Sequence, residues 1–361
     1  MVRLRRRYGC LLGILGLVLA LIALDRIFPP PLSVAGDVSH VVRDRTGIVL
    51  RTFPVDDGRW RLPADLDTID PDFLDALVAY EDERFFSHVG VDPLAVLRAS
   101  RDSLAAGRIV SGASTLSMQL ARLVEPRERT LGAKFLQMIR AVQIEMRLSK
   151  VEILEAYLTL APYGGNLEGV RAASWAYFGR EPDELTIEQI ALLIALPQSP
   201  EARRPDRRPQ DAIAARGRVL DRLANVGLAS PEAARDAALD PAPQRRAFPA
   251  LAWHASEGLV RGLDPEQGGV DIVSTLDYAL QSALETAIGH ELPVGDDASQ
   301  LAVLVVENET RAVRASLGSA SRARPGGWID LTGRARSPGA ALKPFVYGMA
   351  IDDGVEGRMA T

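Results

Sequence analysis

Cysteine is nearly absent from this chain, whose 361 residues include only Cys10. A single cysteine cannot form an intrachain disulfide, so the chain is compatible with an oxidising compartment without indicating one. Nothing in the sequence suggests a zinc or iron site. An excess of positive charge is also lacking, because the net charge is -5 although four arginines crowd the N-terminus. The remainder is more acidic still, which makes nucleic acid a poor candidate partner.

Charged residues are also missing from positions 10–24. With its apolar flanks this run approaches the roughly 20 residues that span a bilayer, and we expect a transmembrane anchor at residues 10–28. The basic tail at residues 1–9 predicts a cytoplasmic N-terminus. A cleavable signal peptide is the rival interpretation, but Asp25-Arg26-Ile27-Phe28 stands where a small-residue cleavage site should lie.

Helical patterns dominate the chain after the anchor, so we expect a mainly α fold. Ser149 with Glu152, and Thr186 with Gln189, have the spacing of capping boxes that open apolar-periodic helices. The pattern changes near residue 270, where alternating apolar residues predict strands. A second region is therefore expected to begin there.

An acidic residue continues an apolar helix face at position 81. Asp70-Pro71 has the pattern of an N-cap followed by proline at the first helical position. Four apolar residues then mark one face at helical spacing: Phe73, Leu74, Leu77 and Val78. Glu81 continues that face, so its carboxylate should point towards the interior or a cleft, where it suits a general base or acid. A buried structural glutamate, paired with an arginine or a helix end, is the alternative.

Five segments resemble, in order, the five signatures of one enzyme family. They are residues 81–92, 112–122, 134–145, 153–180 and 191–200. The first reads Glu81-Asp82-x-x-Phe85-x-x-His88-x-Gly90-x-Asp92, and the set resembles the family 51 glycosyltransferases, the peptidoglycan polymerases of class A penicillin-binding proteins. The resemblance implies an α-helical, lysozyme-like glycosyltransferase domain at residues 37–235 with a cleft between its lobes.

The same resemblance implies the reaction. The 4-hydroxyl of one lipid-linked disaccharide, lipid II, attacks the anomeric carbon of a growing glycan strand with inversion and expels undecaprenyl pyrophosphate. This makes the chain an inverting hexosyltransferase with lipid II, the glycan strand and the inner membrane as partners. Cell-wall synthesis proteins are further candidate partners. The implied location is the inner membrane, with a single span and a periplasmic catalytic domain.

Residue roles follow from the matching positions. Glu81 matches the catalytic glutamate and is expected to act as the base. Ser114, Thr115 and Gln119 would donate hydrogen bonds to the sugar diphosphate. Phe85 would form part of the cleft wall. Capping or surface roles are the alternative for these polar residues.

The third signature supplies the charges and also a departure. Lys134 and Arg140 would neutralise the leaving group. Gln137 stands where most members carry a second glutamate, and Ala133 where they carry arginine. That glutamate helps to organise the diphosphate, often with a divalent cation, so its absence weakens the case for a protein-bound metal. We expect no tightly bound cofactor and leave open a Mg²⁺ or Mn²⁺ ion carried with the lipid diphosphate.

Other residues of the signatures are expected to be structural. His88 should fix the loop that follows it by hydrogen bonds, and Asp82 and Asp92 should support the fold. Asp82 borders the catalytic face, so a substrate contact stays open for it. Tyr157 is expected to belong to the scaffold.

The last region resembles the opening of a penicillin-binding transpeptidase. In that family a nucleophilic serine lies three residues before a lysine, but here Ala340 precedes Lys343 at that spacing. Ser337 is six residues from Lys343, with Pro338 between them, and is a poor substitute. The sequence also lacks the later motifs of that family before Thr361. We therefore expect a linker at 236–269 and a truncated α/β transpeptidase-like region at 270–361 without transpeptidase activity.

Two other functions stay open at this point. A lytic enzyme of lysozyme-like fold would use Glu81 as an acid on existing glycan. A catalytically silent cell-wall scaffold would agree with Gln137 and Ala340 but not with the joint presence of Glu81, Gln119 and Lys134.

Overall fold

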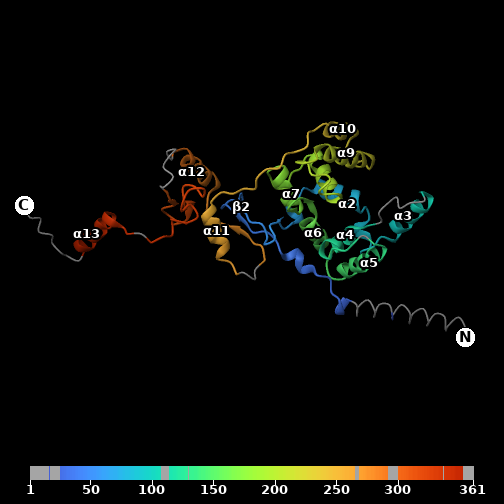
Figure 1. Cartoon of the computed structure of the whole chain (residues 1–361), viewed down its shortest axis with the longest axis horizontal. Helices are drawn as coiled ribbons and strands as arrows, with labels where there is room; N and C mark the ends of the chain where they lie inside the picture. Colours follow the sequence, from blue (N-terminus) through green and yellow to red (C-terminus); the bar gives the residue numbers. More distant parts are fainter. Residues whose placement is uncertain are drawn as a thin grey trace, which may run out of the picture. The chain divides into compact units, whose positions relative to one another are not determined.

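The computed structural model describes residues 16, 25–106, 114–128, 130–264, 268–291, 300–335 and 337–352. The basic tail and most of the expected anchor at residues 10–28 lie outside this set. Among the described residues, no helix combines the length and apolar character needed to cross a membrane. The chain divides into a first unit, residues 1–250 with 259–274, and a second unit, residues 251–258 with 275–361 (Figure 1).

The first unit is mainly helical, as predicted. Its helices are α2 (Pro71–Glu81), α3 (Pro93–Ala106), α4 (Leu116–Val124), α5 (Leu131–Glu145), α6 (Lys150–Leu160), α7 (Val170–Tyr177), α8 (Ile187–Ala195), α9 (Pro209–Asn225) and α10 (Pro231–Ala238). The helix α4 packs against α5 and α6 (Figure 1). The helix α8 packs against α2 and α9. Every residue of α8 from Ile190 to Ala195 is buried, so this helix lies in the middle of the core.

Helix ends follow the capping residues seen in the sequence. Asp70 accepts a hydrogen bond from the Asp72 amide (2.8 Å) and starts α2. Ser149 and Glu152 form the predicted capping box of α6. At the start of α8, the Gln189 side chain accepts from the Thr186 amide (3.2 Å). These caps satisfy amide groups that a helix leaves without an internal partner.

Two small sheets accompany the helices of the first unit. Strands β1 (Val41–Arg43), β2 (Val49–Thr52) and β6 (Asp271–Val273) form one sheet in the order β2-β1-β6, with β1 antiparallel to β2 and parallel to β6. Strands β3 (Trp60–Arg61), β4 (Pro162–Gly164) and β5 (Leu167–Glu168) form the other.

The position of β6 differs from the expected boundary at residue 270. Val42 lies opposite Ile272 in the β1–β6 pair, and the Val41 amide donates to the Val270 carbonyl (3.0 Å). The Arg43 guanidinium also bonds Asp271 (2.7 Å). Residues 270–274 therefore complete a sheet of the first unit. The expected linker, 236–269, contains the end of α10 and the whole of the helix α11 (Trp253–Arg261).

The second unit contains α12 (Tyr278–Glu291), strands β7 (Val303–Val306) and β8 (Val313–Leu317), and α13 (Lys343–Asp352). The strands pair antiparallel, with Leu304 opposite Ser316. Gln281 fastens α12 to β8, because its amide donates to the Ser316 carbonyl (3.0 Å) and accepts from the Ser316 amide (2.8 Å).

Candidate active site

A cleft of about 870 Å³ opens in the first unit between α2, α4, α5 and the short 3-10 helix η4 (Leu196–Gln198). Six residues expected at the site line it: Glu81, Ser114, Gln119, Lys134, Gln137 and Arg140. They come from segments far apart in the sequence, so the fold gathers in one place the polar groups that the sequence analysis grouped by signature.

Glu81 is the last residue of α2, and its carboxylate is held from two sides. The Gln119 side-chain amide donates to one oxygen (2.8 Å), and the Gln198 side-chain amide donates to the other (2.8 Å). A carboxylate offers about four lone-pair positions, so two acceptor positions remain after these bonds. Glu81 can therefore accept a proton from a group in the cleft.

The residues after Glu81 join α2 to the start of α4. The Asp82 carboxylate accepts from the Leu116 amide (2.9 Å) and lies 3.0 Å from the His88 Nε2. Both side chains are buried. His88 thus holds the start of this loop through Asp82, which precedes it, and Asp82 sets the spacing between Glu81 and α4. The predicted bonds of His88 to the loop that follows it stay a prediction.

Asp92 is also structural, as predicted. It accepts from the amides of Leu94 (3.0 Å) and Ala95 (3.1 Å) at the start of α3 and bonds Arg84. Burial alone would raise the pKa of Asp92, but the bonds from Arg84 and the two amides lower it below its usual value.

Tyr157 does more than expected for a scaffold residue. Its hydroxyl donates to the Gln119 amide oxygen over 3.4 Å. Burial, and next the negative charge of Glu81, raise the pKa of Tyr157 well above its usual value, so the phenol stays protonated and acts as a donor. With its oxygen facing Tyr157, the Gln119 amide presents its N–H to Glu81. The helical pattern of α6 contained no signal for this contact.

Two cations face the cleft without an ionic partner in the described part of the chain. They are Lys134 on α5 and Arg122 on α4. The sequence analysis assigned no role to Arg122. Its position three residues after Gln119 puts both on one helical face, and that spacing was the available signal. These cations can stabilise negative charge on a bound group.

Arg140 lines the same cleft but already has partners. Its guanidinium donates to Glu125 (2.7 Å), to Gln143 (2.8 Å) and to the Phe28 carbonyl. Burial would raise the pKa of Glu125, yet Arg140 and Arg127 together lower it, so Glu125 is an anion that neutralises part of their charge. A role for Arg140 with the leaving group stays a prediction.

Two residues expected to contact substrate lie elsewhere. Thr115 is buried as the N-cap of α4, where its hydroxyl accepts from the Met118 amide (3.1 Å) and donates to the Gly90 carbonyl (2.6 Å). Phe85 is fully buried in the core, with the Lys150 ammonium 4.4 Å above its ring. Neither lines the cleft, because capping and core packing use these side chains fully.

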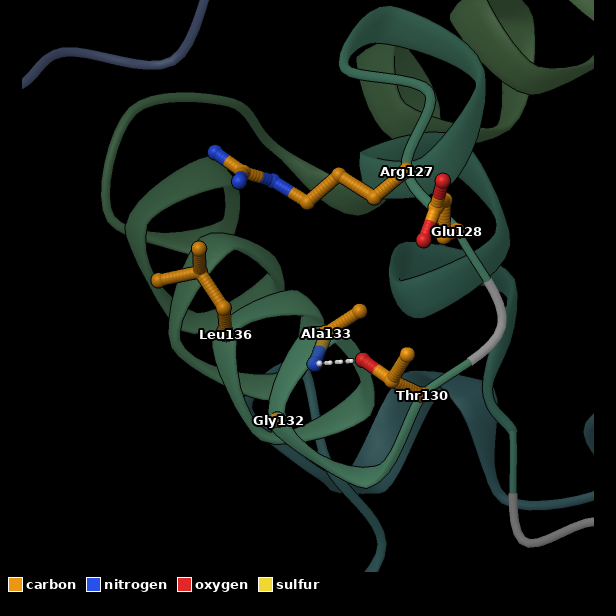
Figure 2. Close-up of a pocket in the computed structure, with 6 residues that line it drawn as sticks. All are labelled: Arg127, Glu128, Thr130, Gly132, Ala133 and Leu136. Carbon is orange, nitrogen blue, oxygen red and sulfur yellow. Dashed lines mark hydrogen bonds between the residues drawn. The ribbon is translucent and has the colours of Figure 1, made fainter.

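A smaller hollow of about 350 Å³ adjoins the cleft at the start of α5. It shares four lining residues with the cleft: Arg127, Glu128, Thr130 and Ala133. Figure 2 shows Arg127 extending over α5 on the side of Leu136, and the Thr130 hydroxyl accepting from the Ala133 amide (3.1 Å). The cleft thus continues beyond Lys134 along the first turn of α5.

The donors for a metal ion are sparse in this site. Within the ranges that the structure describes, no three His, Cys, Asp or Glu side chains group closely enough to hold an ion. Gln137 stands at the position where the sequence analysis noted a glutamate in most members of the resembled family. Its side-chain amide donates to the Met118 carbonyl. The expectation that no metal ion is tightly bound stays a prediction.

A family model and several curated proteins are similar to this chain. Residues 46–224 match the family described as Transglycosylase. The chain is 40% identical to penicillin-binding protein 1C of Escherichia coli (strain K12) over 364 residues, covering 98% of this chain and 46% of that protein. It is 35% identical to penicillin-binding protein 1A of Aquifex aeolicus over 242 residues, covering 64% of this chain and 33% of that protein.

A third relative, penicillin-binding protein 1A of Escherichia coli (strain K12), is 41% identical over 169 residues, covering 46% of this chain and 20% of the relative. The chain thus spans less than half the length of the curated relatives it matches here.

Proposed function

Because this chain belongs to the transglycosylases of the class A penicillin-binding-protein type, we propose that it polymerises lipid II into peptidoglycan strands and releases undecaprenyl pyrophosphate. The observation that supports this most strongly is the pairing of groups across one cleft. The Glu81 carboxylate lies on one side and the Lys134 ammonium on another. Glycosyl transfer from a diphosphate needs both a base and a cation.

The base acts on the attacking hydroxyl. As the 4-hydroxyl oxygen of one lipid-linked disaccharide forms a bond to the anomeric carbon of the other strand, Glu81 takes the hydroxyl proton. The bond from that carbon to the diphosphate oxygen breaks at the same time, and the electron pair leaves with the diphosphate. Attack on the face opposite the leaving group inverts the anomeric carbon.

The cations act on the leaving group. Negative charge grows on the diphosphate as its bond to carbon breaks, and Lys134 and Arg122 stabilise that charge more in the transition state than in the ground state. A Mg²⁺ or Mn²⁺ ion carried with the lipid diphosphate would add charge of the same sign. Ser114 and Gln119 supply neutral hydrogen bonds to the sugar diphosphate.

The proposal includes a place for the reaction. Residues 10–28 would anchor the chain in the inner membrane with the first unit in the periplasm, because the apolar run follows a basic tail. The described end of this segment contacts the site helix α5, since the Gln143 side-chain amide donates to the Phe28 carbonyl (3.2 Å). Such an attachment would keep the cleft near a lipid-linked substrate.

Transpeptidase activity is not part of the proposed function. Ala340 occupies the position where a serine nucleophile would precede Lys343 by one helical turn, and a methyl group cannot attack a peptide carbonyl.

Incubation of the full chain with lipid II tests the function. We expect glycan strands to lengthen while undecaprenyl pyrophosphate appears, and preformed glycan to stay intact. Shortening of preformed glycan without consumption of lipid II would identify a lytic enzyme instead. No reaction with either substrate would favour a silent scaffold.

A further inference from the structure

We propose that Gln198 and Arg203 are positioning residues for the Glu81 base. Neither residue was assigned a role from the sequence. This inference rests on the proposed function, because it concerns the same carboxylate.

The contact begins at Glu81. One of its oxygens accepts from Gln119, which lies on α4, and the other accepts from Gln198, which ends η4. Because the two donors come from different elements and bind different oxygens, they fix the plane of the carboxylate. Amide donors also favour the ionised form of a carboxylic acid, and a general base must be ionised to act.

Arg203 determines which way the Gln198 amide points. Its Nη1 donates to the Gln198 amide oxygen (2.9 Å) and to the carbonyl of Ala195 at the end of α8 (2.7 Å). A guanidinium can only donate, so the amide oxygen of Gln198 must face Arg203. The amide nitrogen is then left to face Glu81. Arg203 therefore acts on the base through Gln198.

The two sides of the carboxylate have the same organisation. Tyr157 orients Gln119 on one side, and Arg203 orients Gln198 on the other. In both pairs a donor occupies the amide oxygen, so the amide can only donate to Glu81. The base thus has two aligned donors and keeps free acceptor positions for the substrate hydroxyl.

The charged and titratable groups near these residues are consistent with this organisation. Tyr157 and Tyr163 face Glu81, and burial raises the pKa of both phenols, so neither carries negative charge. Burial and the charge of Arg218 lower the pKa of Arg203, while Tyr80 and Glu81 act in the opposite direction. A guanidinium still remains protonated at neutral pH.

Stability alone does not account for these contacts. The bonds from Gln198 to Glu81 and from Arg203 to Gln198 are solvent-exposed, and exposed polar contacts contribute little to folding. Their effect should appear in the reaction instead of in the melting temperature.

Steady-state polymerisation of lipid II by the full chain tests the inference with Gln198→Leu, Arg203→Met, the double variant and Arg207→Met. Arg207 is an exposed arginine of the same loop that does not line the cleft, so Arg207→Met is the matched control. We expect kcat to fall about tenfold in Gln198→Leu and about threefold in Arg203→Met, the scale of a lost bond to a charged group. KM should stay within about twofold and the control should match wild type.

Two further readouts separate positioning from a structural role. The double variant should be no slower than Gln198→Leu, since Arg203 acts only through Gln198. The melting temperatures of Gln198→Leu and Arg207→Met should match wild type, and Arg203→Met should be lowered slightly by the loss of its bond to the Ala195 carbonyl.

Additive losses in the double variant would overturn the inference while leaving an active wild type. A loss of kcat only in proportion to a lowered melting temperature would overturn it too, and Arg203→Met gives this answer even if Gln198→Leu fails to fold. An inactive wild-type chain would overturn the proposed function and this inference with it.

Discussion

Gln137 is the residue at which this site differs from the third signature of the resembled family, where most members carry glutamate. Its amide donates to the Met118 carbonyl and so connects α5 to α4 across the cleft wall. A glutamate at this position could not donate that bond. Its carboxylate would have to turn away from the carbonyl and face the cleft, where the diphosphate is proposed to bind.

Replacing Gln137 with Glu should therefore make polymerisation depend more strongly on Mg²⁺, because carboxylates hold this ion better than amides do. The loss of the bond to Met118 should also lower the free energy of unfolding by about 1 kcal/mol. Cation titrations of both forms, together with chemical unfolding, measure the two effects. Superimposable cation titrations would show that position 137 does not meet the leaving group.

Residue types and spacing located much of the site before the structure. Glu81, Gln119 and Lys134 all line the cleft. The apolar helix face indicated Glu81, and the resemblance to the family signatures indicated Gln119 and Lys134. The prediction that Thr115 contacts the substrate was wrong, because a hydroxyl that caps a helix and one that binds a ligand look alike in sequence. Gln198 was missed because it follows α8 in a short 3-10 turn, where no periodicity shows the direction of a side chain.

At the scale of the element, the start of α4 is the joint between the Glu81 loop and the cleft. Asp82 accepts from the first amide of the helix, and Thr115 bonds both the helix and the Gly90 carbonyl. Gly90 has φ +78, and a side chain there would meet the backbone of Ala141 at 2.7 Å. The loop can therefore approach α5 closely only with glycine at this position.

Thr115→Ala should lower the free energy of unfolding by about 1 to 2 kcal/mol, the usual effect of a lost N-cap. Thr115→Ser keeps the hydroxyl and should lose much less. KM for lipid II should stay unchanged in both variants, since Thr115 does not line the cleft. Chemical unfolding and initial rates measure these effects, and a raised KM in a fully stable Thr115→Ala protein would return this residue to the substrate site.

Strand pairing was harder to predict than strand formation. The alternating pattern near residue 272 correctly indicated a strand, but it carries no information on which strand will be its neighbour. β6 pairs with β1, more than two hundred residues earlier in the chain, and Arg43 and Asp271 reinforce the pair. A long-range partner of this kind depends on tertiary contacts that local spacing does not encode.

At the scale of the whole molecule, an ionic network ties the sheet of the first unit to its helices. Glu181 bonds Arg171 on α7 (2.8 Å) and Arg43 on β1 (3.1 Å). Burial alone would raise the pKa of Glu181, but the bonds and charges of the two arginines outweigh it and lower the pKa below its usual value. The stabilisation is therefore present at neutral pH and is lost as the pH falls through the lowered pKa.

Glu181→Gln should destabilise the first unit by about 2 kcal/mol at pH 7. The difference in the free energy of unfolding between wild type and Glu181→Gln should shrink below about pH 4, because Glu181 then binds a proton when the wild-type chain unfolds. Glu184→Gln is the control, since its side chain is 86% exposed and its bond to Arg180 is long at 3.4 Å. Unfolding curves at several pH values test this, and a difference that is constant from pH 7 to pH 3 would contradict the network.

The second unit leads to a prediction about penicillin. Ala340 lies in the short 3-10 helix η5 (Gly339–Leu342). This helix ends directly before Lys343, the first residue of α13. Without a hydroxyl at position 340, we expect no covalent band when the chain is incubated with a fluorescent penicillin and run on a denaturing gel. A band that disappears on Ser337→Ala would reveal an unforeseen nucleophile in this unit.

The central claim is that Glu81 is the base of a glycosyl transfer, and one comparison tests it most directly. Lipid II polymerisation is measured for wild type, for Glu81→Gln, and for Glu83→Gln at an exposed position two residues away. Glu81→Gln keeps the shape of the side chain but removes the base, so the rate should fall by about a hundredfold or more, while Glu83→Gln should match wild type. A Glu81→Gln chain that polymerises lipid II at the wild-type rate would contradict the account.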